Sequence, residues 1–169
     1  CISYLTIEHR GPIDRGLREA MGGWLFGCDL CQTACPFDSP RPGEPDFTAA
    51  GAALTGIDLA GLLGLDEEAF RRRFRATPLW RPRREGLLRN ALIVAANLQR
   101  RECEEPARAL LRDPSPVLRE TASWCLAELG ARGAVADLQA AVRAEKDLAL
   151  RRVLAQDLIR LAGSAPGSV

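Results

Sequence analysis

The chain has 169 residues, of which 47% are hydrophobic and 5% are aromatic, and its formal net charge is +1. This length allows one ordinary domain or a small domain joined to a repeat array. Leu and Ala dominate the composition, which favours helices over a β-sandwich. The sequence contains no run of eighteen apolar residues, so it excludes a membrane-spanning helix and no membrane partner is expected.

The six cysteines carry the clearest chemical signal. In a chain rich in Leu, Ala and Arg they indicate a reducing cytoplasm and metal ligation rather than a disulfide framework. Cys28, Cys31 and Cys35 are followed by Pro36 and have the spacing C-x2-C-x3-C-P. That spacing matches the end of the bacterial ferredoxin run, whose last cysteine ligates a second cluster. An iron–sulfur centre is favoured, with structural zinc, a disulfide and bare thiols as alternatives.

A four-iron cluster needs four thiolates, and the local run supplies at most three. Cys1 lies 27 residues before Cys28 and becomes the fourth candidate if the intervening segment folds back. If the ligand arrangement of two-cluster ferredoxins applies, Cys1, Cys28 and Cys31 would hold one cluster and Cys35 would ligate another. The remaining ligands would lie outside this sequence. Because the chain starts on Cys1 without a methionine, we expect a piece of a longer protein.

Three other residues of metal-binding type are assigned no site. Cys125 follows Trp124 inside an apolar stripe and should be a small buried hydrophobe. Cys103 lies in a charged turn and has no partner at ligand spacing. His9 stands beside Arg10 and before a Gly-Pro turn, which is typical of a surface residue.

The charge is unevenly distributed along the chain. Residues 71–101 contain ten arginines and one acid, Glu85, so this stretch carries +9 and the rest of the chain −8. Concentrated arginine on an otherwise acidic protein indicates a partner that bears phosphates. The alternative is a solvated helix face with ordinary surface arginines.

Local patterns predict short helices in the first half of the chain. Asp14 is a candidate N-cap for a helix that runs to Met21 and ends at a Gly-Gly pair. A short helix with Leu59, Leu62 and Leu63 should precede a second one, which Asp66 caps and which runs to about residue 75. Its apolar face would consist of Ala69, Phe70 and Phe74.

The second half of the chain is repetitive. The pairs Leu88-Arg89, Leu118-Arg119 and Leu150-Arg151 recur at intervals of 30 and 32 residues. Turn residues at 113–116 and 130–133 break the pattern into paired amphipathic helices. A repeat of this length built from helix pairs is typical of a HEAT-like α-solenoid.

Four segments are therefore expected, in a fold that is mostly α. Residues 1–45 form a small ferredoxin-like 4Fe-4S segment that ends in a Pro-rich linker, and residues 46–85 form a helical connector with the Arg-rich stretch. Residues 86–163 form a domain of HEAT-like α-helical repeats, and residues 164–169 form a disordered tail.

Three stretches together resemble the C-terminal part of one enzyme family, epoxyqueuosine reductase. They read CISYLTIEHRGPI, MGGWLFGCDLCQTACPFD and FRATPLWRPRREGLLRNALIVAANL, and they occur in the order of the family. The family uses cobalamin and two [4Fe-4S] clusters to reduce epoxyqueuosine to queuosine at the wobble position of tRNA. The resemblance implies that Cys1, Cys28, Cys31 and Cys35 are cluster ligands.

The resemblance also implies which functional parts lie in this chain and which lie outside it. The cobalamin-binding domain, the proton-donating acid and the first cysteine run of the family lie outside this sequence, so no catalytic residue is assigned here. This chain would supply cluster ligands for electron transfer and part of the tRNA-binding surface. The protein would be a cytoplasmic monomer that takes electrons from an unknown donor protein. The residues expected to contact tRNA are Arg81, Arg83, Arg84 and Arg89.

Three other functions share some of these features. A ferredoxin-like electron-transfer module with a helical docking array would use the same cysteines without binding tRNA. A protein similar to the reductive dehalogenases would use a related set of cobalamin and clusters. A zinc-stabilised HEAT-like scaffold would have no redox role, because zinc does not change its oxidation state.

Overall fold

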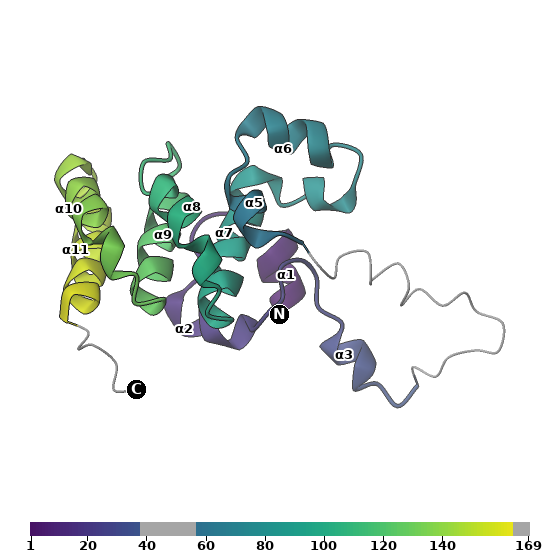
Figure 1. Ribbon diagram of the computed structural model, residues 1–169. Helices are drawn as coiled ribbons and strands as arrows, with labels where there is room; N and C mark the ends of the chain where they lie inside the picture. The colour runs from purple at the N-terminus through teal and green to yellow at the C-terminus, as the bar shows by residue number, and fades with distance from the viewer. Residues whose placement is uncertain (38–56, 164–169) are drawn as a thin grey trace.

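The computed structural model describes residues 1–37 and 57–163. Every regular element in these two ranges is a helix and none is a strand, so the predicted mostly α fold is confirmed (Figure 1). Within the same ranges, no helix has the length and apolar character needed to cross a bilayer. The α-helices are α1 (Ile2–Ile7), α2 (Arg15–Arg18), α3 (Leu30–Thr33), α5 (Leu59–Leu63), α6 (Glu67–Phe74), α7 (Arg83–Asn97), α8 (Glu104–Leu110), α9 (Pro116–Glu128), α10 (Val135–Ala144) and α11 (Leu148–Gly163). Short 3-10 helices are η1 (Glu19–Met21), η2 (Pro78–Trp80), η3 (Arg101–Cys103) and η4 (Arg132–Ala134).

Helix α7 is the centre of the molecule. It contacts α1, η1, α5, α6 and α9, and every residue from Gly86 to Ala96 is buried. Helix α9 in turn packs on α7, α8 and α11, and α10 packs on α11. Figure 1 shows these helices stacked side by side from α7 to α11, which is the expected HEAT-like arrangement.

The turns between the stacked helices follow from local sequence. The hydroxyl of Ser115 accepts a hydrogen bond from the N–H of Leu118 at 3.2 Å and caps α9, while Pro116 occupies the first turn, where its missing N–H costs nothing. Beyond the other end of α9, Gly130 has φ = +62°, a conformation that a side chain would strain. Both predicted breaks in the repeat are confirmed.

The caps predicted in the first half are also confirmed. The Asp14 carboxylate accepts a hydrogen bond from the N–H of Gly16 at 2.8 Å, and the Asp66 carboxylate accepts one from Ala69 at 2.7 Å. Phe70 is fully buried and Phe74 is 7% exposed, so α6 turns the expected face inward. Ala69 is only half-buried.

The residues before Gly27 share one core with the helical stack. Ile13 and Met21 are fully buried and belong to the same apolar cluster as Leu88, Leu118 and Leu154. The predicted Pro-rich linker lies almost entirely outside the described residues, as does the predicted tail, so both stay predictions. The residues before Gly27 are therefore packed on α7 and do not form a separate body.

Candidate metal centre and arginine surface

The three clustered cysteines lie on and around α3. Cys31 is in this four-residue helix and is exposed, whereas Cys28 before it and Cys35 after it are half-buried. The backbone carbonyl of Asp29 accepts hydrogen bonds from the N–H of Gln32 and of Thr33, both at 2.9 Å, which forms the turn. No residue of α3 is buried, and Figure 1 shows the helix standing away from the helical stack. Packing therefore contributes little to the shape of this segment.

The remote cysteine stands at the start of α1. Cys1 is exposed, and its carbonyl accepts a hydrogen bond from the N–H of Leu5 at 3.1 Å. In the described residues, no three His, Cys, Asp or Glu side chains come together as a group that could hold a metal ion. The structure therefore does not bring the four sulfurs of Cys1, Cys28, Cys31 and Cys35 together, and their joint role stays a prediction.

The donor chemistry of these four residues nevertheless fits a thiolate-bound metal centre. All four are free thiols, and each is exposed or half-buried, so a metal can reach them. Cys103 and Cys125 are different, because both are fully buried. Burial raises the pKa of the Cys103 thiol to about 11 and raises that of Cys125 still further. Thiols that stay protonated are poor ligands, which supports their exclusion from the site.

The prediction that Arg89 contacts RNA is wrong. Its side chain is 1% exposed and its guanidinium donates to three backbone carbonyls of the N-terminal segment, those of Leu5 (2.7 Å), His9 (3.1 Å) and Gly11 (2.7 Å). Burial lowers its pKa to about 10, so the group is still charged at neutral pH. Arg89 holds the fold together and cannot reach a phosphate outside it.

Arg84 is also used inside the molecule. Its side chain is only 14% exposed, and it pairs with the carboxylate of Asp113 at 2.8 Å and donates to the carbonyl of Leu65 at 2.7 Å. This contradicts a place on an RNA-facing surface. The two remaining predicted residues, Arg81 and Arg83, are exposed. Arg81 pairs with Glu8 at 2.6 Å, and the Arg83 guanidinium lies 4.7 Å from the centre of the Trp80 ring.

The exposed arginines border a groove between α1 and η2. Its volume is about 480 Å³, and its basic and aromatic lining includes Arg10, Arg81, Arg83, Trp80 and Phe26. Four further arginines, on α6 and directly after it, are exposed as well: Arg71, Arg72, Arg73 and Arg75. They belong to the Arg-rich stretch of the sequence. The sequence alone could not show that they are exposed whereas Arg84 and Arg89 are not.

The Leu-Arg recurrence in the sequence was an indication that Arg89 has a structural role. The arginines of the two later Leu-Arg pairs act in the same way, because Arg119 donates to the carbonyls of Asp113 and Pro114 and Arg151 donates to that of Glu145. All three satisfy backbone carbonyls that lie earlier in the chain. An arginine at a fixed position of the repeat is therefore a structural element of each unit.

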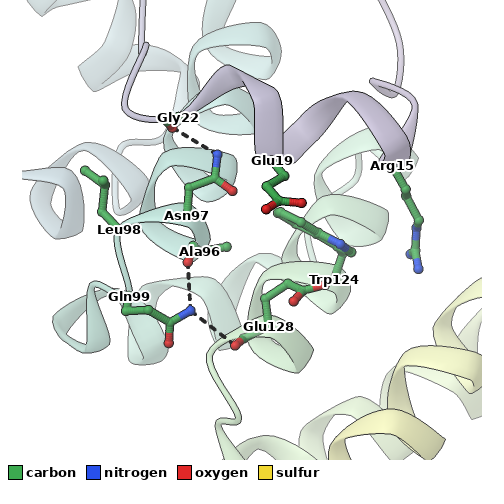
Figure 2. A pocket seen from close by; sticks show the side chains of 9 residues that line it. All are labelled: Arg15, Glu19, Gly22, Ala96, Asn97, Leu98, Gln99, Trp124 and Glu128. Carbon is green, nitrogen blue, oxygen red and sulfur yellow. Dashed lines mark hydrogen bonds between the residues drawn. The ribbon is translucent and has the colours of Figure 1, made fainter.

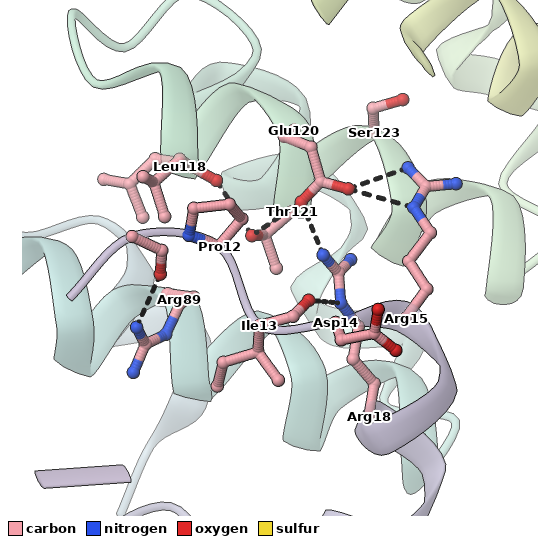
Figure 3. Close-up of polar contacts among 12 residues, drawn as sticks. Pro12, Ile13, Asp14, Arg15, Arg18, Arg89, Leu118, Glu120, Thr121 and Ser123 are labelled. Atoms are coloured by element: carbon pink, nitrogen blue, oxygen red, sulfur yellow. Dashed lines mark hydrogen bonds and ion pairs between the residues drawn. The ribbon is translucent and has the colours of Figure 1, made fainter. Parts of the chain in front are cut away.

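A partly buried ion-pair network joins the segment before Cys28 to α9 and α11. Arg15 contacts the carboxylates of Glu120 and Asp157 at 2.8 and 2.7 Å, and Arg18 contacts Glu120 at 2.6 Å. Figure 3 shows both guanidinium groups directed at the Glu120 carboxylate. Burial alone would lower the pKa of Arg15, but the two carboxylates raise it above its ordinary value. This network was not predicted, because its partners are up to 142 residues apart in the sequence.

Comparison with known proteins places these features in context. Residues 1–38 match the family described as the 4Fe-4S double cluster binding domain. Over 138 residues the chain is 40% identical to an epoxyqueuosine reductase of Alicycliphilus denitrificans, which covers 76% of this chain and 38% of that protein. It is 30% identical over 155 residues to the epoxyqueuosine reductase of Bacillus subtilis, which covers 87% of this chain and 38% of that protein.

Solved structures show the same similarity. A crystal structure of epoxyqueuosine reductase with a tRNA-Tyr epoxyqueuosine-modified tRNA stem loop superimposes with a TM-score of 0.77 at 29% identity, over 96% of this chain and 44% of that one. The Bacillus subtilis enzyme superimposes with a TM-score of 0.76 at 28% identity. The chain spans about two fifths of the length of the relatives that it matches. In sequence and in fold, the chain corresponds to part of the epoxyqueuosine reductases that it matches.

Proposed function

We propose that this chain supplies thiolate ligands to the iron–sulfur clusters of an epoxyqueuosine reductase. The observation that carries the proposal is the set of four free, reachable thiols inside the segment that matches a double cluster domain. Cys1, Cys28 and Cys31 would hold one cluster, and Cys35 would ligate a second one. The other ligands would come from residues outside this chain.

The chemistry of the whole protein would rest on groups that this chain only partly holds. Clusters supply single electrons, and cobalamin, bound outside this chain, supplies the reduction of the epoxide. Within the chain, the half-buried side chains of Trp24, Leu25 and Phe26 precede Cys28 and would limit water near a cluster. No residue of this chain is assigned a catalytic role. The product would be queuosine at the wobble position of tRNA, made by a cytoplasmic monomer that receives electrons from a donor protein.

The cluster assignment is tested by changing ligands one at a time in the full natural protein. Cys31→Ser should lower the iron bound after anaerobic reconstitution, because serine oxygen is a poorer ligand for iron in a cluster than thiolate. Cys103→Ala serves as the control, since the thiol that it removes is buried in the helical stack. Equal iron content in the wild type and the Cys31 variant would count against the proposal.

The tRNA-binding surface would lie around the groove lined by Arg81, Arg83 and Trp80. Two exposed guanidinium groups beside an aromatic ring can contact phosphates and stack on a base. A related epoxyqueuosine reductase has been crystallised with a tRNA stem loop, which supports RNA as the partner. The arginines of α6 would extend the surface.

Binding to an anticodon stem loop at several salt concentrations tests this surface. The double variant Arg81→Ala/Arg83→Ala should bind more weakly, with a salt slope reduced by about 2, because each lost phosphate contact removes about one released counterion. The matched control, Arg143→Ala/Arg152→Ala, removes the same charge from exposed positions on α10 and α11. Unchanged affinity and slope in the first variant would remove this part of the proposal.

A further inference from the structure

We propose that Asn90 and Thr6 are positioning residues that hold α1, the helix that follows Cys1, against the backbone that leads into Cys28. The two side chains form what we call the latch. This inference rests on the proposed role of both cysteines as cluster ligands. It assigns to α7 a task beyond packing, because Asn90 lies in that helix and reaches both cysteine-bearing segments.

The amide of Asn90 links the two segments directly. Its Nδ2 atom donates to the carbonyl of Thr6 at 2.8 Å and to the carbonyl of Leu25 at 3.0 Å. Its Oδ1 atom accepts from the guanidinium of Arg89, at 2.9 Å from Nη2, which orients the amide. Asn90 is fully buried, so water does not compete for these bonds. One side chain therefore fixes the distance between α1 and the approach to Cys28.

The hydroxyl of Thr6 makes the second link. It donates to the carbonyl of Ile2 at 2.9 Å within α1, and it accepts a hydrogen bond from the N–H of Gly27 at 3.0 Å. Thr6 is fully buried, and Gly27 immediately precedes Cys28. Because Gly27 has φ = +74°, a side chain at this turn would be strained.

The latch fixes the backbone a few residues away from the candidate ligands. Thr6 lies five residues after Cys1, in the helix whose first turn includes the Cys1 carbonyl. The α3 segment beyond Gly27 is exposed and has no buried residue, so packing does not hold it in place. Ordering the two ligand-bearing segments before metal binding lowers the entropy lost when the metal binds. Loss of the latch should therefore affect iron binding more strongly than it affects the stability of the fold.

Asn97 offers a matched control on the same helix. Its amide also donates to two backbone carbonyls, those of Arg18 at 2.8 Å and Gly22 at 2.9 Å. Figure 2 shows this amide directed at Gly22, on the wall of a cavity that holds none of the candidate ligands. Asn97 thus donates two bonds to the backbone around η1, as Asn90 does to its own carbonyls, but it does not touch α1 or the residues before Cys28.

The experiment compares iron release in the full natural protein after anaerobic reconstitution. Asn90→Ala should lose iron to a chelator about 10-fold to 100-fold faster than the wild type, whereas Asn97→Ala should differ by about 2-fold or less. Thr6→Val should also accelerate release, and its control is Thr121→Val, because Thr121 is a buried threonine whose hydroxyl donates to Val117 inside α9. The free energy of unfolding is measured for all four variants, and the electron paramagnetic resonance line shape should change only in the two latch variants.

Each outcome decides between the possibilities. If the latch variants and their controls release iron at equal rates, with the same line shape, the latch has a structural role alone and the inference is wrong. If the wild type binds no iron, the proposed cluster function fails first. Should Asn90→Ala not fold, Asn90→Asp keeps the volume and the oxygen facing Arg89 but donates nothing, and Thr6→Val provides an independent reading.

Discussion

Helix α7 and the α3 segment differ in where their stability comes from. In α7 eleven consecutive residues are buried, and its polar side chains Arg89 and Asn90 find partners inside the protein. In α3 no residue is buried, and three cysteines stand free on and around it. The helical stack is thus specified by its own contacts, whereas the cysteine segment lacks internal contacts that would hold it. The proposed cluster would supply the missing constraint in the second region.

The arginines of the Arg-rich stretch also divide into residues with partners inside the fold and exposed residues. Arg89 and Arg84 are used by the fold, whereas Arg81 and Arg83 are exposed only a few residues away. A run of basic residues therefore contains two populations with different tasks. Burial separates the arginines that stabilise the protein from those that are available to a partner.

Thiol labelling should reveal the largest difference between the two regions. In the metal-free protein, the thiols at positions 1, 28, 31 and 35 should react with a thiol reagent about 1,000-fold faster than Cys103 and Cys125. The two buried thiols react only after local or global unfolding, and burial raises their pKa, which further lowers the fraction of thiolate.

The labelling experiment carries its own control. In denaturant, all six thiols should react at similar rates, because the differences arise from the folded state. Rapid labelling of Cys125 under native conditions would contradict the tight packing of α9 against α7. Slow labelling of Cys31 would contradict the exposed position of α3.

Removing the buried guanidinium should cause the next largest effect, on stability. Arg89→Met should lower the free energy of unfolding by about 3 kcal/mol or more, because three partly buried carbonyls lose a charged donor. Arg132→Met, at an exposed position in η4, should change it by about 0.5 kcal/mol or less. Urea unfolding followed by circular dichroism measures both, and equal stabilities would show that Arg89 is not structural.

A smaller effect should appear as a dependence of stability on pH. Burial opposes ionisation of Glu145, but the N–H of Asp147 and the Arg119 side chain lower its pKa below the ordinary value. Glu145 therefore stabilises the fold fully above about pH 5, and this contribution is lost as the pH falls through the lowered pKa of the folded state.

The pH effect is measured by urea unfolding between about pH 5 and pH 3. Glu145→Gln should show a shallower loss of stability over that range than the wild type, because it lacks the group that takes up a proton. The exposed control Glu105→Gln should follow the wild type more closely. Identical curves for the wild type and Glu145→Gln would mean that this carboxylate does not contribute to acid unfolding.

Features that depend on neighbouring residues could be predicted from the sequence. The caps at Asp14 and Asp66 and the breaks around Pro114 and Gly130 are set by a few adjacent residues, and the periodicity identified the stacked helices. The composition of the cysteine run indicated its chemistry without its geometry, since spacing does not determine where a remote Cys1 lies.

Features that depend on distant contacts could not be predicted in this way. Arg89 is buried because carbonyls about 80 residues earlier in the chain need donors, and nothing near it in the sequence shows those carbonyls. Arg15 and Asp157 pair across 142 residues for the same kind of reason. The Leu-Arg recurrence was the one available hint, because it marks an arginine that every repeat unit uses.

The metal content of the full natural protein, purified without oxygen, decides whether the candidate thiols hold an iron–sulfur cluster. We expect a brown protein that contains iron and acid-labile sulfide in similar amounts, with visible absorbance from thiolate-to-iron charge transfer that decreases when the clusters are reduced. A colourless protein that contains stoichiometric zinc and no iron would contradict it, because zinc bound to the same thiols could not transfer electrons.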